Sequence, residues 1–335
     1  MDWPDDVRVA CSGQSMDAGQ LWWELGRRTG ARGAAAILVR RLVADADDVV
    51  ALPAASGWTR RMHPSCDWVV MRVQTIAGFL ESLSRLAVKG LDASQSYPPD
   101  KARRAVSAAI KQVRLAQLER LDVSSLELGA TAHAFARAQP IRQARLRSLR
   151  VEHNALRSSV SDVVRSLATP GTLRRLAIGD NDATLQHLMF LTKDLYLSGL
   201  QRLDLGPNAV TGSDVLDLFR ASPPLQLSEL GIAGVPGVEQ VAGDLFAQST
   251  LPALRRLRLH GSLRPRFLPA LAKLGLLDRI EYLDLTGADF QEEDVESLLS
   301  IPKPQGLTVN LDERDLPPTL RVRAQQWLEG GVDRR

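Results

Sequence analysis

Leu200 to Leu205 reads LQRLDL, and closely similar phrases recur along most of the chain. The phrases are LSRLAV, LERLDV, LRSLRV, LRRLAI, LQRLDL, LSELGI, LRRLRL and IEYLDL, beginning at residues 83, 118, 146, 173, 200, 227, 254 and 280. A weaker ninth copy, PQGLTV, begins at residue 304. The leucine at the fourth position of each phrase falls at 86, 121, 149, 176, 203, 230, 257, 283 and 307, so successive spacings are 35, 28, 27, 27, 27, 27, 26 and 24. Four identical intervals in succession indicate an internal structural repeat.

Each phrase alternates apolar and polar residues, which is typical of a strand with one buried face. The segments between phrases have helical spacing, as at Val160, Val163, Val164 and Leu167. Breakers such as Pro170-Gly171 and Pro223-Pro224 separate these segments from the next phrase. The repeat therefore predicts a strand, a loop, a helix and a turn. Because one such module cannot bury its own apolar face, neighbouring modules must stack into a solenoid.

On these motifs the chain resembles leucine-rich repeat proteins, of the long-repeat subclass that includes ribonuclease inhibitor and the GALA-type bacterial effectors. The resemblance covers residues 80–311, about nine repeats, and implies a right-handed α/β horseshoe. It also implies a structural ladder of Asn154, Asn181 and Asn208, whose side chains would bind backbone in the bend after each strand. The Asn position is replaced in five repeats, at Leu91, Leu126, Val235, Ser262 and Ala288. Those bends are expected to be less regular.

Residues 1–79 do not fit the repeat and carry five of the six tryptophans. We expect a mostly helical N-terminal cap that covers the open face of the first repeat. The alternative is a separate docking module, since the segment VVALPAASGWTRRM from Val49 has a faint likeness to an F-box. Residues 312–335 predict a C-terminal cap helix and tail, with Leu320 and Trp327 shielding the last strand.

The candidate groups for catalysis or metal binding are few. The five histidines, at positions 63, 133, 153, 187 and 260, have no metal-binding spacing with other ligands, and His63 with Cys66 is half a zinc site at best. Cys11 and Cys66 are the two cysteines, and no nucleophile elbow, HExxH helix or phosphate loop is present. We read the glycine-rich Gly26–Gly33 as a turn. The sequence therefore predicts no catalytic residues, no metal and no cofactor.

The composition is that of a folded protein: 335 residues, 44% of them hydrophobic, with a net charge of +3 and a pI of about 9.1. No apolar run approaches the length of a membrane span, and the acidic first residues argue against a signal peptide. We expect a cytoplasmic setting, or the host cytosol if the chain is a secreted bacterial effector.

The third, fifth and seventh positions of each phrase should point onto the concave face of the solenoid. The candidate partner-binding residues there are Arg85, Arg120, Arg150, Arg175, Arg202, Arg256, Arg258, His260 and Tyr282. We expect Asp122, Asp204 and Asp284 to neutralise most of these arginines. The expected exception is the set of Arg256, Arg258 and His260, whose own strand supplies no acid. The small residues Gly179, Gly206, Gly231 and Ala233 should leave an open floor for a partner's side chains.

Charge is polarised along the repeats. Residues 137–175 hold nine arginines and two acids, whereas residues 278–315 hold eleven acids and three bases. Such polarity suits a protein partner, with an acidic patch, more than a nucleic acid, which favours a uniformly basic groove with interleaved aromatics. Head-to-tail self-association is a further option.

Three functions follow in order of preference. The first is a non-enzymatic protein-interaction scaffold that binds its partner on the concave parallel sheet. The second is an adaptor whose N-terminal region recruits ubiquitin-ligase components or other machinery while the repeats select the substrate. The third is binding of a phosphate-rich ligand or RNA on the arginine stripe.

Overall fold

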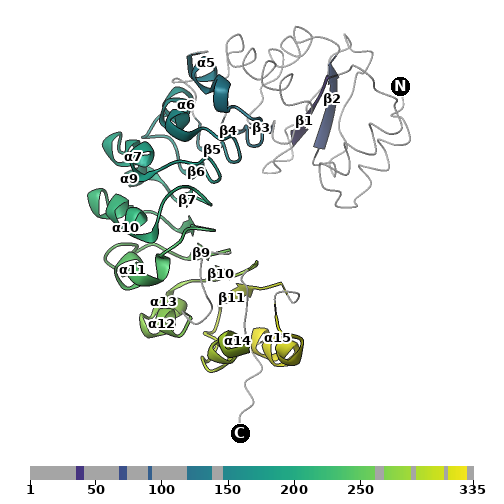
Figure 1. Ribbon diagram of the computed structural model, residues 1–335, viewed down its shortest axis with the longest axis vertical. Helices are drawn as coiled ribbons and strands as arrows, with labels where there is room; N and C mark the ends of the chain where they lie inside the picture. Colours follow the sequence, from purple (N-terminus) through teal and green to yellow (C-terminus); the bar gives the residue numbers. More distant parts are fainter. Residues whose placement is uncertain are drawn as a thin grey trace. The chain divides into compact units, whose positions relative to one another are not determined.

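The structure is a computed structural model that describes residues 35–40, 68–73, 90–92, 119–137, 146–260, 268–287, 292–312 and 316–329 (Figure 1). The chain divides into two compact units, Met1–Leu173 and Arg174–Arg335.

The first unit begins with an antiparallel pair of strands. β1 (Ala35–Arg40) pairs with β2 (Trp68–Val73), so that Ile37 faces Met71. These strands are the part of residues 1–79 that the structure describes, and they are extended where a mostly helical cap is expected from the sequence. The F-box-like segment from Val49 lies outside the described residues.

Three parallel strands of the repeat follow in the first unit. They are β3 (Gly90–Asp92), β4 (Arg120–Asp122) and β5 (Ser148–Arg150), and Leu91, Leu121 and Leu149 align as neighbours across them. The sequence prediction of Leu86 as the first rung is therefore wrong. Leu91 takes that place, and the first interval is 30 residues (121 − 91) instead of 35. Arg85 lies outside the described residues.

Helices return the chain from one strand to the next. In the first unit these are the 3₁₀ turn η3 (Gly129–Thr131), α5 (Ala132–Arg137), the 3₁₀ turn η5 (Arg157–Ser159) and α6 (Val160–Leu167). The apolar stripe predicted for α6 is confirmed, because Val160, Val163, Val164 and Leu167 are all buried. The helix ends at Leu167, and the next residue, Ala168, has extended backbone just before Pro170-Gly171.

The second unit holds six parallel strands. They are β6 (Arg175–Ala177), β7 (Arg202–Asp204), β8 (Glu229–Gly231), β9 (Arg256–Arg258), β10 (Tyr282–Asp284) and β11 (Thr308–Asn310). The rung of apolar residues through their centres is Leu176, Leu203, Leu230, Leu257, Leu283 and Val309. Five of these six agree with the sequence analysis. The last differs, since Val309 pairs with Leu283 where Leu307 is expected from the phrase.

The helices that follow strands β6 to β10 in the chain lie on one side of these strands (Figure 1). They are α7 (Leu185–Leu188), α8 (Phe190–Lys193), α9 (Tyr196–Gly199), α10 (Gly212–Ala221), α11 (Val238–Leu245), α12 (Leu268–Lys273), α13 (Leu276–Arg279) and α14 (Glu292–Leu299). α10 shows why they form: Thr211 and Asp214 make a reciprocal cap at its start, and Pro223-Pro224 follow its end. Its buried face includes Val215, Leu218 and Phe219.

The core lies between the strands and the helices. The central leucines of the strands are almost completely buried, as Leu203, Leu230 and Leu257 show. Burial of each such side chain contributes about 1.5–3 kcal/mol, so the stacked rungs stabilise the array. The predicted α/β leucine-rich repeat fold is confirmed in its strand–helix alternation and its parallel register.

The last described segment closes the second unit. The 3₁₀ turn η8 (Pro318–Leu320) leads into α15 (Arg321–Leu328), which packs beside α14. Leu320 and Trp327 are buried, and the Trp327 indole donates a hydrogen bond of 2.7 Å to the Ile301 carbonyl. The role of residues 312–335 as a cap stays a prediction, which this packing supports. Among the described residues, every helix is too short or too polar to span a bilayer.

Candidate partner-binding surface

The candidate residues of the second unit lie on the face of the β6–β11 sheet that carries the third and fifth phrase positions, opposite the helices. We call it the open face. Parallel register sets two rows across it. The third-position row is Arg175, Arg202, Glu229, Arg256 and Tyr282. The fifth-position row is Ala177, Asp204, Gly231, Arg258 and Asp284.

Glu229 is the centre of the charge network on the open face. Its Oε1 lies 3.4 Å from Nη1 of Arg202 and 3.2 Å from Nε of Arg258, and its Oε2 lies 4.0 Å from Nε of Arg256. Its side chain is 15% exposed, so the three guanidinium groups largely replace water around it. Glu229 is not among the binding residues predicted from the sequence. Glu229 could have been identified from the sequence, because it is the single acid among the arginines at the third position of the phrases.

Arg258 also reaches a second acid, two strands away. Its Nη1 donates a hydrogen bond of 3.2 Å to Oδ2 of Asp204, although β8 lies between the two strands. The intervening residue is Gly231, and a Cβ built there would lie 2.7–2.8 Å from the Asp204 carboxylate atoms. The absence of a side chain at Gly231 therefore allows the Arg258 guanidinium to contact the Asp204 carboxylate.

Two expectations are corrected by this network. Arg256 and Arg258 were expected to lack acids, but β7 and β8 supply Asp204 and Glu229. The open floor expected at Gly231 is filled by the Asp204 carboxylate. At Gly206 the missing side chain serves a close approach instead, because a Cβ there would lie 2.7 Å from Cα of Gly179.

Arg256 makes a cation–π contact on the open face. Its guanidinium carbon lies 4.6 Å from the centroid of the Tyr282 ring on the next strand. The Arg256 side chain is 52% exposed, so it keeps much of its surface towards solvent while one face rests on the ring.

Arg175 stands at the other end of the row. It lies beside Arg202 in register, as expected from the phrase spacing. It is exposed, and within the described part of the chain it makes no ion pair.

His260 follows β9 and belongs to a different cluster. Its Nδ1 lies 3.0 Å from Oγ1 of Thr286, which donates a hydrogen bond of 2.8 Å to Oδ1 of Asp284. The Asp284 carboxylate also accepts from Nδ2 of Asn310 at 3.2 Å. Asp284 therefore binds Thr286 and Asn310, where the sequence analysis expected it to pair with an arginine.

The three aspartates at the fifth position share a local role that the sequence analysis missed. Oδ1 of Asp122, Asp204 and Asp284 accepts the backbone N–H of the residue two positions on, at 3.0–3.1 Å. Each acid therefore closes the bend after its own strand, which is a common use of aspartate in turns.

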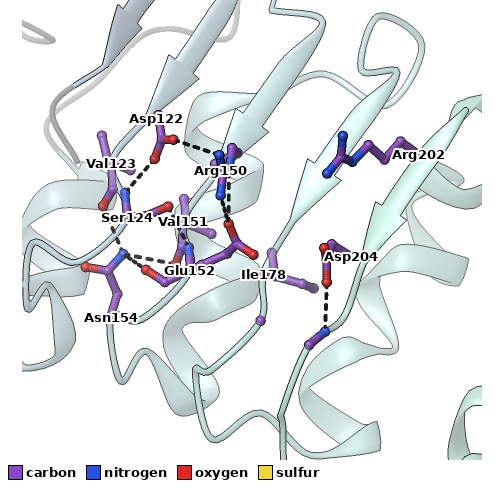
Figure 2. A network of polar contacts seen from close by, with 12 residues as sticks. Asp122, Val123, Ser124, Arg150, Val151, Glu152, Asn154, Ile178, Arg202 and Asp204 are labelled. Atoms are coloured by element: carbon purple, nitrogen blue, oxygen red, sulfur yellow. Dashed lines mark hydrogen bonds and ion pairs between the residues drawn. The ribbon is translucent and has the colours of Figure 1, made fainter. Parts of the chain in front are cut away.

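In the first unit, Arg150 pairs with two acids (Figure 2). Its Nη2 lies 2.6 Å from Oε2 of Glu152, and its Nη1 lies 3.5 Å from Oδ2 of Asp122 on β4. Internal pairing is thus the arrangement at Arg150. Arg120 opens β4, where it is in register with Ser148.

The three asparagines lie in the bends after β5, β6 and β7. Oδ1 of Asn154 accepts from the backbone N–H groups of Leu126 and Leu128, while its Nδ2 donates to the carbonyls of Val123 and Val151 (Figure 2). The side chains of Asn154 and Asn208 each join their own bend to that of a neighbouring repeat.

In the second unit, Oδ1 of Asn208 accepts from the N–H groups of Asn181 and Ala183, and its Nδ2 donates to the carbonyls of Ile178 and Leu205. Nδ2 of Asn181 donates to the carbonyls of Ile178 and Gly179.

One polar cluster in the first unit has the order of a catalytic triad. His133 Nε2 lies 3.4 Å from Oγ of Ser159, and its Nδ1 lies 3.4 Å from Oδ2 of Asp162. Ser159 is only 6% exposed and sits at the junction of η5 and α6. Because a buried hydroxyl is closed to a substrate, we interpret the cluster as a polar contact between α5 and α6.

The described residues contain no group of three or more His, Cys, Asp and Glu side chains arranged to hold a metal ion. His63, Cys66, Cys11 and the Gly26–Gly33 turn lie outside the described residues.

Burial, with the nearby positive charge of Arg255, lowers the pKa of the Arg279 guanidinium, whose Nη2 donates to the Phe246 carbonyl.

Comparison with known proteins identifies distant structural likenesses only. No family model and no curated protein matches the sequence. A crystal structure of a TLR13–ssRNA13 complex aligns with a TM-score of 0.39 and 15% identity over 74% of this chain and 33% of that chain. This chain thus spans about a third of that one. The Rad7 and Elc1 complex in yeast aligns with a TM-score of 0.34 and 12% identity over 73% of this chain and 76% of that chain. Both TM-scores are below 0.5, so the fold assignment stands on the repeat spacing and the strand register.

Proposed function

We propose that the chain is a non-enzymatic interaction scaffold that binds a protein partner on the open face of the β6–β11 sheet. The observation that carries this proposal is Arg256, a half-exposed guanidinium held over the Tyr282 ring by two neighbouring strands. A planar cation fixed on a rigid sheet is pre-organised for a carboxylate. Arginine and tyrosine are also enriched among the residues that dominate binding energy in protein interfaces.

The charges of the open face favour a protein over a nucleic acid. Glu229 and Asp204 lie in the middle of the arginine rows, where they would repel a continuous phosphate backbone. Tyr282 is the aromatic residue of the third-position row, whereas sequence-tolerant nucleic-acid binding uses a series of stacking rings. RNA or another phosphate-rich ligand therefore remains the third candidate.

We extend the proposal to the biological setting. The length of the repeats supports a relationship to the ribonuclease-inhibitor-like, GALA-like bacterial proteins, and we propose that the chain works in the cytoplasm or, as an effector, in the host cytosol. The partner would present an acidic patch. The second candidate is an adaptor whose N-terminal segment recruits other machinery. Self-association through the polarised charge is a further candidate.

The test is an affinity capture with the full chain from a lysate of the source cells. Arg256→Ala removes the guanidinium above Tyr282, and its matched control is Arg220→Ala on α10. Both arginines are about half-exposed and contact one acid each, Glu229 and Asp244. We expect Arg256→Ala to release a captured protein that wild type and Arg220→Ala retain. Identical captures for all three would contradict binding on the open face.

A further inference from the structure

The arginines of the open face have two different environments. Arg202 and Arg258 are about one-third exposed and lie within 3.4 Å of a carboxylate oxygen of Glu229 or Asp204. Removing either would leave a mostly buried carboxylate short of a partner, which is costly. These two arginines are therefore part of the sheet's own structure.

Arg175 and Arg256 differ from that pair. Arg175 is exposed and makes no ion pair with any residue the structure describes, and Arg256 is 52% exposed at 4.0 Å from Glu229. On strands β6 to β9 the third and fifth positions hold four arginines and two acids, so two positive charges are in excess. The excess is located at Arg175 and Arg256, because the shorter contacts of the two acids, at 3.2–3.4 Å, are with Arg202 and Arg258, and Glu229 lies 4.0 Å from Arg256.

The register fixes how far apart these two charges stand. Arg175 is on β6 and Arg256 is on β9, with β7 and β8 between them in the same row. Three strand spacings of about 4.8 Å separate the two backbones by about 14 Å. An extended chain rises about 3.3 Å per residue, so about four residues cover that distance.

We infer that the open face recognises an extended acidic segment of a protein that crosses the strands, with two carboxylates four positions apart, one at Arg175 and one at Arg256. The inference rests on the proposed function and names the chemistry of its partner. Tyr282 orients the second anchor, since its ring holds one face of the Arg256 guanidinium. Arg202 and Glu229 lie between the two anchors and form an ion pair with each other. Because their charges offset each other, we expect the partner to be neutral where it crosses them.

The same spacing disfavours a nucleic acid as the occupant. A single strand carries a phosphate at every nucleotide, so at least one phosphate would lie over Glu229 between the anchors. An acidic peptide with neutral residues between its two acids avoids this repulsion.

The experiment uses the full chain and ten-residue Ser/Gly peptides with two glutamates at i and i+2, i and i+4, or i and i+6. Binding is measured at low salt by NMR titration, and a uridine homopolymer is titrated in parallel. We expect the i, i+4 peptide to bind most tightly. Arg175→Ala and Arg256→Ala should each weaken it about fivefold and the double variant about 25-fold, because the sites are far enough apart to act independently. Arg220→Ala should leave the affinity within about 1.5-fold, since its exposed pair lies on α10.

Several results would overturn the inference. Equal affinity for all three spacings, dependence on only one of the two arginines, or absence of peptide binding would each exclude the two-anchor arrangement. Tighter binding of the homopolymer that is lost in the double variant would identify a nucleic acid as the occupant. If the lysate partner still depends on Arg256 in those cases, the scaffold function stands and only its chemistry is wrong. Circular dichroism of each variant separates lost binding from lost folding.

Discussion

The bends after β5 and β6 and the bend after β8 stabilise a left-handed backbone in different ways. Before Asn154 and Asn181 the left-handed residues are His153 and Asp180, at φ of +55° and +51°. At the equivalent place before Val235 the chain has Gly234, at +68°. A residue with a Cβ pays about 1 kcal/mol for this conformation, and glycine does not. Hydrogen bonds from the asparagine side chains offset the strain in the first case.

This difference shows that the bend after a strand can be stabilised in two ways, and the asparagine of the repeat is one of them. Val235 and Leu126, which replace asparagine, are fully buried and so contribute apolar packing in place of hydrogen bonds. The bend after β4 combines both, because Leu126 is buried there while its N–H and that of Leu128 donate to Asn154 of the next repeat. Irregular sequence at this position therefore does not mean an irregular bend.

The largest test of the comparison is Asn154→Ala. Asn154 is 1% exposed, and its loss leaves two backbone N–H groups and three carbonyls without this partner. We expect the free energy of unfolding to fall by about 3 kcal/mol or more, measured by urea denaturation. Asn310→Ala, at an exposed strand position, should cost less than about 0.5 kcal/mol. Similar losses for the two variants would show that the bend does not depend on the asparagine.

An intermediate effect is expected for Gly231→Ala, in the repeat whose bend uses glycine. The new methyl group would meet the Asp204 carboxylate at about 2.7 Å and push it away from Arg258 and from the Gly206 N–H. We expect a loss of about 2 kcal/mol in chemical denaturation. Gly243→Ala in α11 is the matched control, because nothing lies within 4 Å of its added Cβ. It should gain about 0.5–1 kcal/mol from helix propensity, and a loss there would undermine the comparison.

The smallest effects come from exchanging the two kinds of bend residue. Ala155 is exposed at φ +50°, so Ala155→Gly relieves strain and should stabilise the fold by about 0.5 kcal/mol. Gly234→Ala introduces strain at φ +68°, with its Cβ 3.1 Å from Cβ of Pro207, and should cost about 1 kcal/mol or more. The two variants should shift the midpoint of thermal unfolding in opposite directions. Shifts of the same sign would mean that backbone strain does not distinguish these bends.

The interior repeats were predictable from the sequence, and the terminal ones were not. From Leu121 to Leu283 the central leucines are those that the phrase identifies, because each strand has a repeat on both sides with the same spacing. At the ends, the register is set by hydrogen bonding to one neighbour, which selects Leu91 over Leu86 and Val309 over Leu307. At the C-terminal end Leu307 and Val309 both fit the alternation, whereas at the N-terminal end Leu91 lies beyond the LSRLAV phrase.

The charges of the open face could be predicted by row but not by partner. Parallel register correctly placed Arg175 beside Arg202. The pairing of Arg258 with Asp204 was missed because it skips a strand, and only the absence of a side chain at Gly231 makes room for it. A glycine in such a row predicts space for a partner, whereas at Gly231 the chain's own Asp204 occupies that space.

The ion pair between Asp204 and Arg258 has a consequence for how the array can evolve and unfold. Most solenoids grow by copying one module, because each module contacts only its nearest neighbours. Here a side chain of one module is tied to the next but one. Inserting a duplicate module between them would move the two charged groups one strand spacing further apart. Unfolding of the middle module alone would separate Asp204 from Arg258 and leave each without this partner. The three repeats that contain β7, β8 and β9 should therefore be duplicated together in evolution and should unfold together.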